Sequence, residues 1–377
     1  MKHLLVGNGI NIQFDKSSYT TKEIVLRILK NCDRTDFPAH IIIDEPYLMK
    51  NYIGHLFLEA RMALQGCYDE YANCKAEEMS LVSFKEQYAN KLSTLKITDI
   101  GFEDYYLIHD LVCHKHNIVN PEQYQIRESM RVAYLLSIYN DGKLDNLHLS
   151  YPRTFIDYLN SFNSIFTTNY DSNVDAVYKK EVYHIHGWFK RISAVYDAES
   201  FRNRLLDAPI KTTSIDNNYY YLYSNALTTH CGAYKEFQVK QSAYANDAIE
   251  KLAHAYKTNP TVKNDVDLWI KEENRLTANI GYAVKLKTEN PNLEFKDDYH
   301  FDKLSNLQGE LEILGLSPWN DFHIFEAIDN SNITRCTYYY FSSEQREKIR
   351  TLLPQLMAKE YIKFVPLSDF WREMYEK

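Results

Sequence analysis

Three side chains with functional groups suited to hydrolysis lie close together in the middle of the chain. Asn169 and Asp171 follow a short apolar run at residues 164–166, and His186 ends a second run, Val-Tyr-His-Ile-His at 182–186. An amide can orient a water molecule, a carboxylate can bind a hydrogen-bond donor, and an imidazole can accept a proton. Two neighbouring parallel strands would bring these groups together at their carboxyl ends. The central stretch therefore predicts a catalytic site.

The second run also contains a second histidine. Alternation along a strand would put Tyr183 and Ile185 on one face and His184 and His186 on the other. His186 is the stronger candidate because it lies at the strand end, and an unperturbed pKa of about 6.5 leaves histidine substantially neutral near pH 7. A core histidine bonded to the backbone is the alternative interpretation. We expect a polar loop and a short helix between the two strands.

A glycine turn near the start of the chain could hold a phosphate group. Residues 3–6 form a strand that ends at Gly7, Gly9 follows, and Thr20 opens a capping box before a helix. Backbone N–H groups in such a turn can bind an anion. Ile12 stands where the dinucleotide fingerprint has its third glycine, so a plain strand-to-helix connection is the alternative.

A second glycine turn, Gly-Leu-Ser at 315–317, follows a strand-like run at 311–314. Asn320 or Asp321 can cap the helix that comes after it. A turn between a strand and a helix amino terminus offers another place for ribose or phosphate. Strands at both ends and in the middle of the chain thus predict one sheet with its turns at one edge.

These segments resemble the motifs of the sirtuins, a family of NAD-consuming enzymes. Thr-Thr-Asn-Tyr-Asp at 167–171 is similar to their T-Q-N-x-D motif, and His186-Gly187 is similar to their catalytic H-G pair. Gly-Asn-Gly-Ile-Asn at 7–11 resembles their G-A-G-x-S turn, with Asn in place of Ser, and the 315–317 turn resembles their G-T-S turn. The resemblance implies that NAD is the substrate.

The chain also departs from the sirtuin deacylases. Its six cysteines contain no C-x-x-C pair, so the zinc module of those enzymes is absent, and so is their G-I-P-x-F-R segment. Bacterial sirtuin-like proteins of anti-phage defence lack the same zinc module and hydrolyse NAD. Residues 315–321 also resemble the AbiH abortive-infection group. We therefore expect an NAD hydrolase and rank protein deacylation last.

The roles expected in such a hydrolase fall on named residues. Asn169 would orient a ribose hydroxyl and the attacking water, Asp171 would hold the nicotinamide carboxamide, and His186 would accept a proton. We expect no metal in the site. The residues expected around NAD are Gly7, Gly9, Asn11, Thr168, Asp171, Gly315 and Ser317.

The resemblance further implies a toxic effector of anti-phage defence that releases nicotinamide and ADP-ribose. Such an enzyme needs control, and we expect a homo-oligomer and a HerA-type ATPase partner. One alternative is a sensor that binds NAD or ADP-ribose without turnover. The other is a nuclease, or the subunit of one in a larger complex, for which the chain shows no carboxylate and metal motif.

Composition sets wider limits on these functions. The chain has 377 residues, of which 45% are hydrophobic and 25% charged, as in ordinary soluble proteins. A net charge of −8 argues against a nonspecific nucleic-acid surface. No run is long and apolar enough for a membrane span, and irregularly spaced cysteines favour a reducing cytoplasm. We expect a cytoplasmic protein.

The order of strand-like and helical runs predicts an α/β protein with a Rossmann-like parallel sheet flanked by helices. Large helical insertions would form a second subdomain. A further buried strand is expected at 40–44. The Cys-His-Lys-His cluster at 113–116 is interpreted as surface or packing, and the tyrosines at 219–223 as packing or self-association. The expected divisions are 1–46, 151–190 and 304–377 for the nucleotide-binding core, and 47–150 and 191–303 for the helical insertions.

Overall fold

A parallel sheet of six strands forms the centre of the fold. The computed structural model describes residues 1–37, 45–119, 122–192, 216–227, 247–272, 275–293, 299–319 and 321–376. All five strand pairings are parallel, and the order β3-β2-β1-β4-β5-β6 is that of a Rossmann fold. The α/β, Rossmann-like sheet expected from the sequence is confirmed. The strands are β1 (Lys2–Val6), β2 (Ser164–Thr167), β3 (Val182–His184), β4 (Gln308–Leu314), β5 (Asn332–Tyr340) and β6 (Ile362–Pro366).

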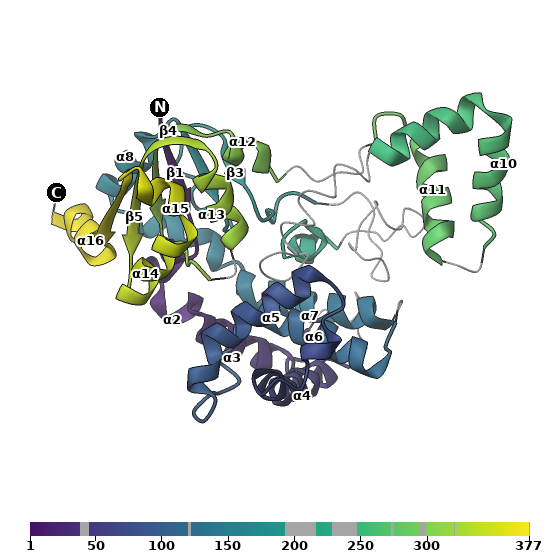
Figure 1. The fold of residues 1–377 in the computed structure, drawn as a ribbon, viewed down its shortest axis with the longest axis horizontal. Coiled ribbons are helices and arrows are strands. Elements are labelled where there is room, and N and C mark those ends of the chain that lie inside the picture. The colour runs from purple at the N-terminus through teal and green to yellow at the C-terminus, as the bar shows by residue number, and fades with distance from the viewer. Residues whose placement is uncertain are drawn as a thin grey trace.

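Each face of the sheet is covered by its own group of helices (Figure 1). Successive side chains of a strand point to opposite faces, so Leu5 of β1 packs with one cluster while Leu4 and Val6 pack with another. The cluster around Leu5 includes apolar residues of α13, α14 and α15, and the other includes residues of α8 and α16. These helices are α8 (Arg153–Asn160), α13 (Phe322–Asp329), α14 (Ser343–Leu352), α15 (Pro354–Ala358) and α16 (Leu367–Glu376).

A block of helices lies between β1 and β2 in the chain and has a large hydrophobic core. α3 packs into this core through Ile24 and Ile28, and its first turn is capped by Thr20, whose side chain accepts a hydrogen bond from the Glu23 N–H. Thr20 is thus the N-cap of α3, as one half of the expected capping box requires. The helices in this part of the chain are α1 (Gly9–Phe14), α2 (Lys16–Tyr19), α3 (Thr21–Asn31), α4 (Pro46–Leu64), α5 (Lys75–Tyr88), α6 (Asp104–His116) and α7 (Glu122–Tyr139), with short 3-10 helices η2 (Asp69–Tyr71), η3 (Ala89–Lys91) and η4 (Leu144–Ser150).

The tyrosine-rich segment packs against this block. Its 3-10 helix η5 (Asn217–Tyr223) buries Tyr221, which stacks on Tyr139 of α7 with ring centroids 4.0 Å apart. Buried Arg131 of α7 donates hydrogen bonds to the carbonyls of Leu222, Ser224 and Ala226. The side chains at 219–223 therefore serve packing, at least in large part.

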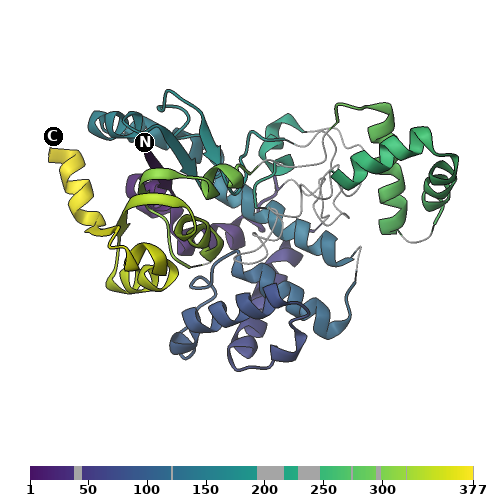
Figure 2. The same cartoon turned by 45° about the horizontal axis from the view of Figure 1, so that its top comes forward.

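The second insertion forms a small helical unit with a separate core. Residues 247–258 are helical, and α10 (Pro260–Trp269) pairs with α11 (Arg275–Glu289) around Val266, Ala283 and Val284. Figures 1 and 2 both show α10 and α11 at the end of the molecule away from the sheet. Helix α12 (Phe301–Ser305) then leads back to β4. No helix of the described segments combines the length and apolar character that crossing a membrane requires.

Two local expectations differ from the structure, and a third concerns residues that the structure does not describe. Turns replace the short helix expected between β2 and β3, because tertiary contacts hold this segment: the Asn173 side chain donates to the Leu144 carbonyl and accepts a hydrogen bond from the His148 N–H. Strand β3 ends at His184, so Ile185 and His186 belong to a turn. The strand expected at 40–44 lies outside the described residues.

Candidate functional site

A pocket of about 700 Å³ opens at the carboxyl edge of the sheet. It lies at the switch point between β1 and β4, where chain connections depart in opposite directions, and ligands of doubly wound sheets bind at such points. Every strand contributes to its lining. The contributing residues are Gly9 beyond β1, Thr168 beyond β2, His186 beyond β3, Gly315 beyond β4, Phe341 beyond β5 and Leu367 beyond β6.

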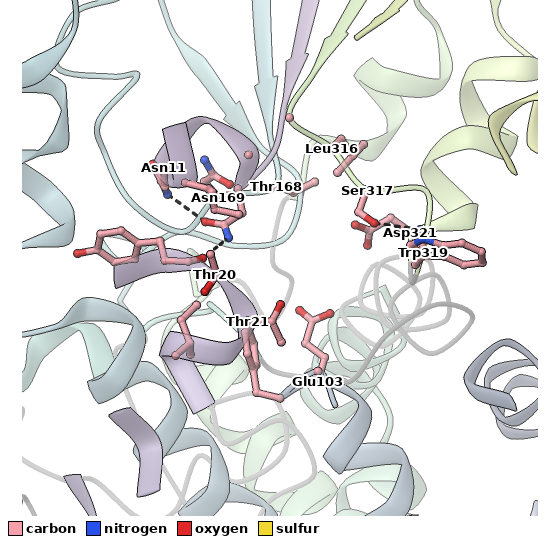
Figure 3. Close-up of a pocket in the computed structure, with 18 of the residues that line it drawn as sticks. Asn11, Thr20, Thr21, Glu103, Thr168, Asn169, Leu316, Ser317, Trp319 and Asp321 are labelled. Atoms are coloured by element: carbon pink, nitrogen blue, oxygen red, sulfur yellow. Dashed lines mark hydrogen bonds between the residues drawn. The ribbon is translucent and has the colours of Figure 1, made fainter. Parts of the chain in front are cut away.

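The helical block forms the wall that faces the sheet edge. Glu103, at the start of α6, lines the pocket across from the strand ends, together with Gln87 and Tyr88 of α5. The Tyr170 hydroxyl donates a hydrogen bond of 3.3 Å to Glu103 and so connects the loop after β2 to this wall. Figure 3 shows Glu103 and Thr21 opposite the strand ends. The pocket is therefore a cleft between two parts of the fold.

The two glycine turns pack directly against each other. The Gly7 N–H donates to the Leu314 carbonyl at 3.0 Å, and the Gly9 N–H donates to the Gly315 carbonyl at 2.8 Å. A Cβ atom on Gly9 would lie 2.5 Å from the Gly315 Cα, and Gly315 itself has φ of +70°. Glycine is thus needed at these positions because two backbones touch.

This packing changes the interpretation of the first turn as a phosphate cradle. The N–H groups of Gly7, Gly9 and Ile10 all donate to carbonyls of the protein, so these three donors do not point at a ligand. Gly9 and Gly315 still line the pocket, whereas Gly7 is not among its lining residues. The turns shape the floor of the pocket, and other groups must bind a ligand.

Asp171 is the most strongly hydrogen-bonded of the predicted site residues. One carboxylate oxygen accepts the Asn11 side-chain amide at 2.8 Å, and the other accepts the backbone and side-chain N–H groups of Asn173. Burial raises the pKa of Asp171 above its ordinary value, although the hydrogen bonds from Asn173 and Asn11 act in the opposite direction. Asp171 and Asn11 both line the pocket, and their bond joins the loop after β2 to α1.

Asn169 lies between the first turn and the loop after β2. Its side-chain amide donates weakly to the Gly7 carbonyl at 3.4 Å, and its backbone N–H donates to the Thr167 hydroxyl. Figure 3 shows Asn169 with Asn11 and Thr168 on one side of the pocket, and Ser317 with Asp321 on the other. The carboxamide therefore stands at the pocket surface with only one long hydrogen bond assigned to it.

His184 has a supporting position behind this loop. Its Nδ1 bonds to the Asn169 carbonyl at 3.0 Å, its Nε2 lies 3.2 Å from Asp175, and its ring stacks on Trp188. His184 is buried and is not among the lining residues of the pocket. Its contacts hold the backbone that carries Asn169.

His186 lines the pocket and meets two residues that follow β4. Its Nε2 lies 3.4 Å from Nε2 of His323 and 3.6 Å from a carboxylate oxygen of Asp321. Asp321 is the residue before α13 and was one of the two expected N-caps of that helix. Its side chain makes no capping hydrogen bond to α13, so this expectation was wrong. Asn320, the other expected cap, lies outside the described residues.

Asp321 and His323 are functional candidates that motif comparison did not single out. Both lie immediately after the second glycine turn, in the triplet Asp-Phe-His at 321–323. The sequence signal that could have identified them is a carboxylate and an imidazole two residues apart, just beyond a strand end. The residues at 113–116 make structural contacts instead: Cys113 packs beside His109, and His114 bonds to the Tyr71 carbonyl.

The charge of the pocket lining is predominantly acidic. Carboxylates come from the sheet edge and from the helical wall, whereas Lys16 is the single lysine or arginine among the lining residues that the structure describes. Such a lining favours positive charge in a bound ligand or transition state. The lining carboxylates are Asp99, Glu103, Asp104, Asp171 and Asp321.

Comparison with known proteins yields no relative: no protein-family model, no curated protein and no solved structure matches the chain. The sheet edge brings together Asn169, Asp171 and His186 with most of the residues expected around NAD.

Proposed function

We propose that the protein hydrolyses NAD at the bond between nicotinamide and ribose. The observation that carries the proposal is the shared pocket at the sheet's switch point, which Asn169, Asp171 and His186 all line. Thr168, Gly315 and Ser317 line the same pocket, as expected for residues around the nucleotide. The sirtuin-like motifs thus fall around one cavity.

The acidic lining suits the charge that develops in this reaction. When the bond from the ribose C1′ to the nicotinamide nitrogen breaks, its electron pair neutralises the pyridinium and positive charge moves to the sugar. Asp321 and Glu103, from opposite sides of the pocket, can stabilise that charge. The leaving group needs no proton, so one basic residue is sufficient.

The remaining roles follow from the contacts of each residue. Asn169 presents its carboxamide to orient a ribose hydroxyl and the attacking water. His186, whose ring stacks on that of His323, takes the proton from that water as its oxygen bonds to C1′. Asp171 fixes Asn11 and uses remaining oxygen lone pairs to accept the nicotinamide carboxamide N–H.

The wider role proposed is that of a toxic effector in anti-phage defence, controlled by assembly. Helices α4 and α5 expose several large apolar side chains, which supports contact with a second copy or with a HerA-type ATPase. Light scattering of the purified chain, alone and with such an ATPase, tests this part. The exposed apolar residues on these helices are Tyr47, Leu48, Leu58, Met62, Met79 and Val82.

The central test is incubation of the purified full chain with NAD, with nicotinamide followed by chromatography and ADP-ribose binding measured by calorimetry. We expect nicotinamide release that is lost in His186→Ala. ADP-ribose binding without any release would instead establish a sensor. Release that His186→Ala leaves unchanged, or a chain that neither binds nor cleaves, would overturn the proposal.

A further inference from the structure

Two histidines and one carboxylate converge at the edge of the pocket. The ligand atoms of His186, His323 and Asp321 lie within 4.8 Å of one another, and this is the one group of three such side chains found among the described residues. His186 is contributed by the turn after β3, while the other two belong to the start of α13. Two separate parts of the chain thus present three potential metal ligands at one point.

The distances within this group suit a tetrahedral ion. Zinc bonds to histidine nitrogen at about 2.0 Å, and tetrahedral angles then place neighbouring ligand atoms about 3.3 Å apart. His186 Nε2 lies 3.4 Å from His323 Nε2 and 3.6 Å from the Asp321 carboxylate. The spacing between His323 and Asp321 is at most 4.8 Å, and a small rotation of the Asp321 side chain would complete the third edge.

We propose that His186, His323 and Asp321 form a binding site for a divalent transition metal of the zinc type. Two imidazoles and one carboxylate are a ligand set typical of zinc sites that keep one coordination position open. His186 and Asp321 line the pocket, so the fourth position faces the cavity. The site lies at the pocket rather than in the hydrophobic core.

A metal at this point changes what His186 can do. The Nε2 lone pair that would bond to the metal is the one that accepts a proton in the proposed hydrolysis, and the two uses exclude each other. This second step rests on the proposed function: a bound zinc ion inhibits NAD hydrolysis until it is removed. Metal binding itself does not depend on that function.

The experiment titrates the metal-stripped full chain with Co²⁺, whose visible absorption distinguishes tetrahedral from octahedral coordination, and then displaces it with Zn²⁺. We expect one tetrahedral equivalent, with affinity reduced more than about a hundredfold in His323→Gln and Asp321→Asn. His116→Ala, which removes an exposed histidine at the end of α6, is the matched control and should bind normally. This control matters because the chain has 13 histidines.

Thermal unfolding with and without Zn²⁺ keeps the test independent of activity and of a failure to fold. The wild-type chain and His116→Ala should gain stability with Zn²⁺, while His323→Gln and Asp321→Asn should not. Octahedral Co²⁺, or equal binding by all four proteins, would refute the site. Tight binding with NAD hydrolysis unchanged by Zn²⁺ would refute the inhibitory step alone, and absent hydrolysis in every sample would count against the proposed function instead.

Discussion

The Nε2 atoms of His186 and His323 lie 3.4 Å apart, although 137 residues separate them in the chain, and their rings are inclined by only 22°. His186 reaches this position from the end of β3 and His323 from α13. The contact fixes the ring of the proposed base against a helix that packs on the sheet. Its energetic and catalytic importance can be tested by substitution.

His186→Ala should lower the rate of nicotinamide release by about 10² to 10⁴, because this is the usual contribution of a positioned general base. His323→Gln should lower kcat less and leave KM nearly unchanged, since His323 orients His186 without lining the pocket. Steady-state kinetics on both variants measures the difference. Equal losses in the two variants would contradict the division of roles.

Asn11→Ala should destabilise the protein by about 1 to 3 kcal/mol, because it removes a donor from buried Asp171. Urea unfolding measures the change. Asn146→Ala is the control, since the Asn146 amide donates to the Gly142 carbonyl at an exposed position and its removal should cost much less. Similar losses for the two variants would show that the Asn11 contact has no special importance.

Gly9→Ala should destabilise the fold and reduce ligand binding, because its Cβ would lie 2.5 Å from the Gly315 Cα. The two turns would have to separate. Gly54→Ala tests the opposite case, since within the described residues no atom beyond the backbone of its own helix lies within 4 Å of the added Cβ, and Gly54 is inside α4. That variant should gain about 0.5 to 1 kcal/mol from helix propensity. Thermal unfolding of both proteins is the measurement.

The ionisation of Glu312 in β4 should make the free energy of unfolding depend on pH. Burial alone would raise the pKa of its carboxyl, but hydrogen bonds from Lys2, Tyr339 and Tyr158 outweigh burial and hold the pKa below its ordinary value of 4.5. The ionised form therefore stabilises the folded state above that value, and this stabilisation is lost as pH falls through the lowered pKa.

Glu312→Gln tests this dependence. At neutral pH the variant should be less stable by about 1 to 3 kcal/mol, as expected when a charge-assisted hydrogen bond is lost. The difference from wild type should shrink steadily below pH 4.5, the ordinary value for the group. Urea unfolding across this pH range gives both numbers. A gap that stays constant with pH would exclude ionisation as its cause.

Local patterns were sufficient to predict the sheet and the polar groups at its carboxyl edge. Apolar runs that end abruptly in polar residues or glycine define β1, β2 and β4, and chemical groups at these ends line one pocket. Residues of the motifs at 167–171 and 315–317 line this pocket. What each residue does there remains a prediction.

Contacts between distant segments could not be predicted in the same way. The approach of His323 to His186 and the packing of Gly9 on Gly315 depend on strand order, which one sequence does not reveal. The short helix expected after Asp171 was wrong because contacts of Asn173 with Leu144 and His148, which local periodicity does not reveal, hold this segment in turns. Residues of α3 were expected in the nucleotide-binding core, yet they pack in the core of the helical block. Helical periodicity shows which face of a helix is buried but not which core it joins.

The pocket draws on segments from Asn8 to Leu367, so its walls come from nearly the whole length of the polypeptide. A nascent chain leaving the ribosome has β1 and the helical block long before β4 and α13 exist. Until those late segments emerge, His186 has no neighbouring His323 and the floor of the cleft lacks Gly315. The pocket can therefore close only after most of the chain has been synthesised.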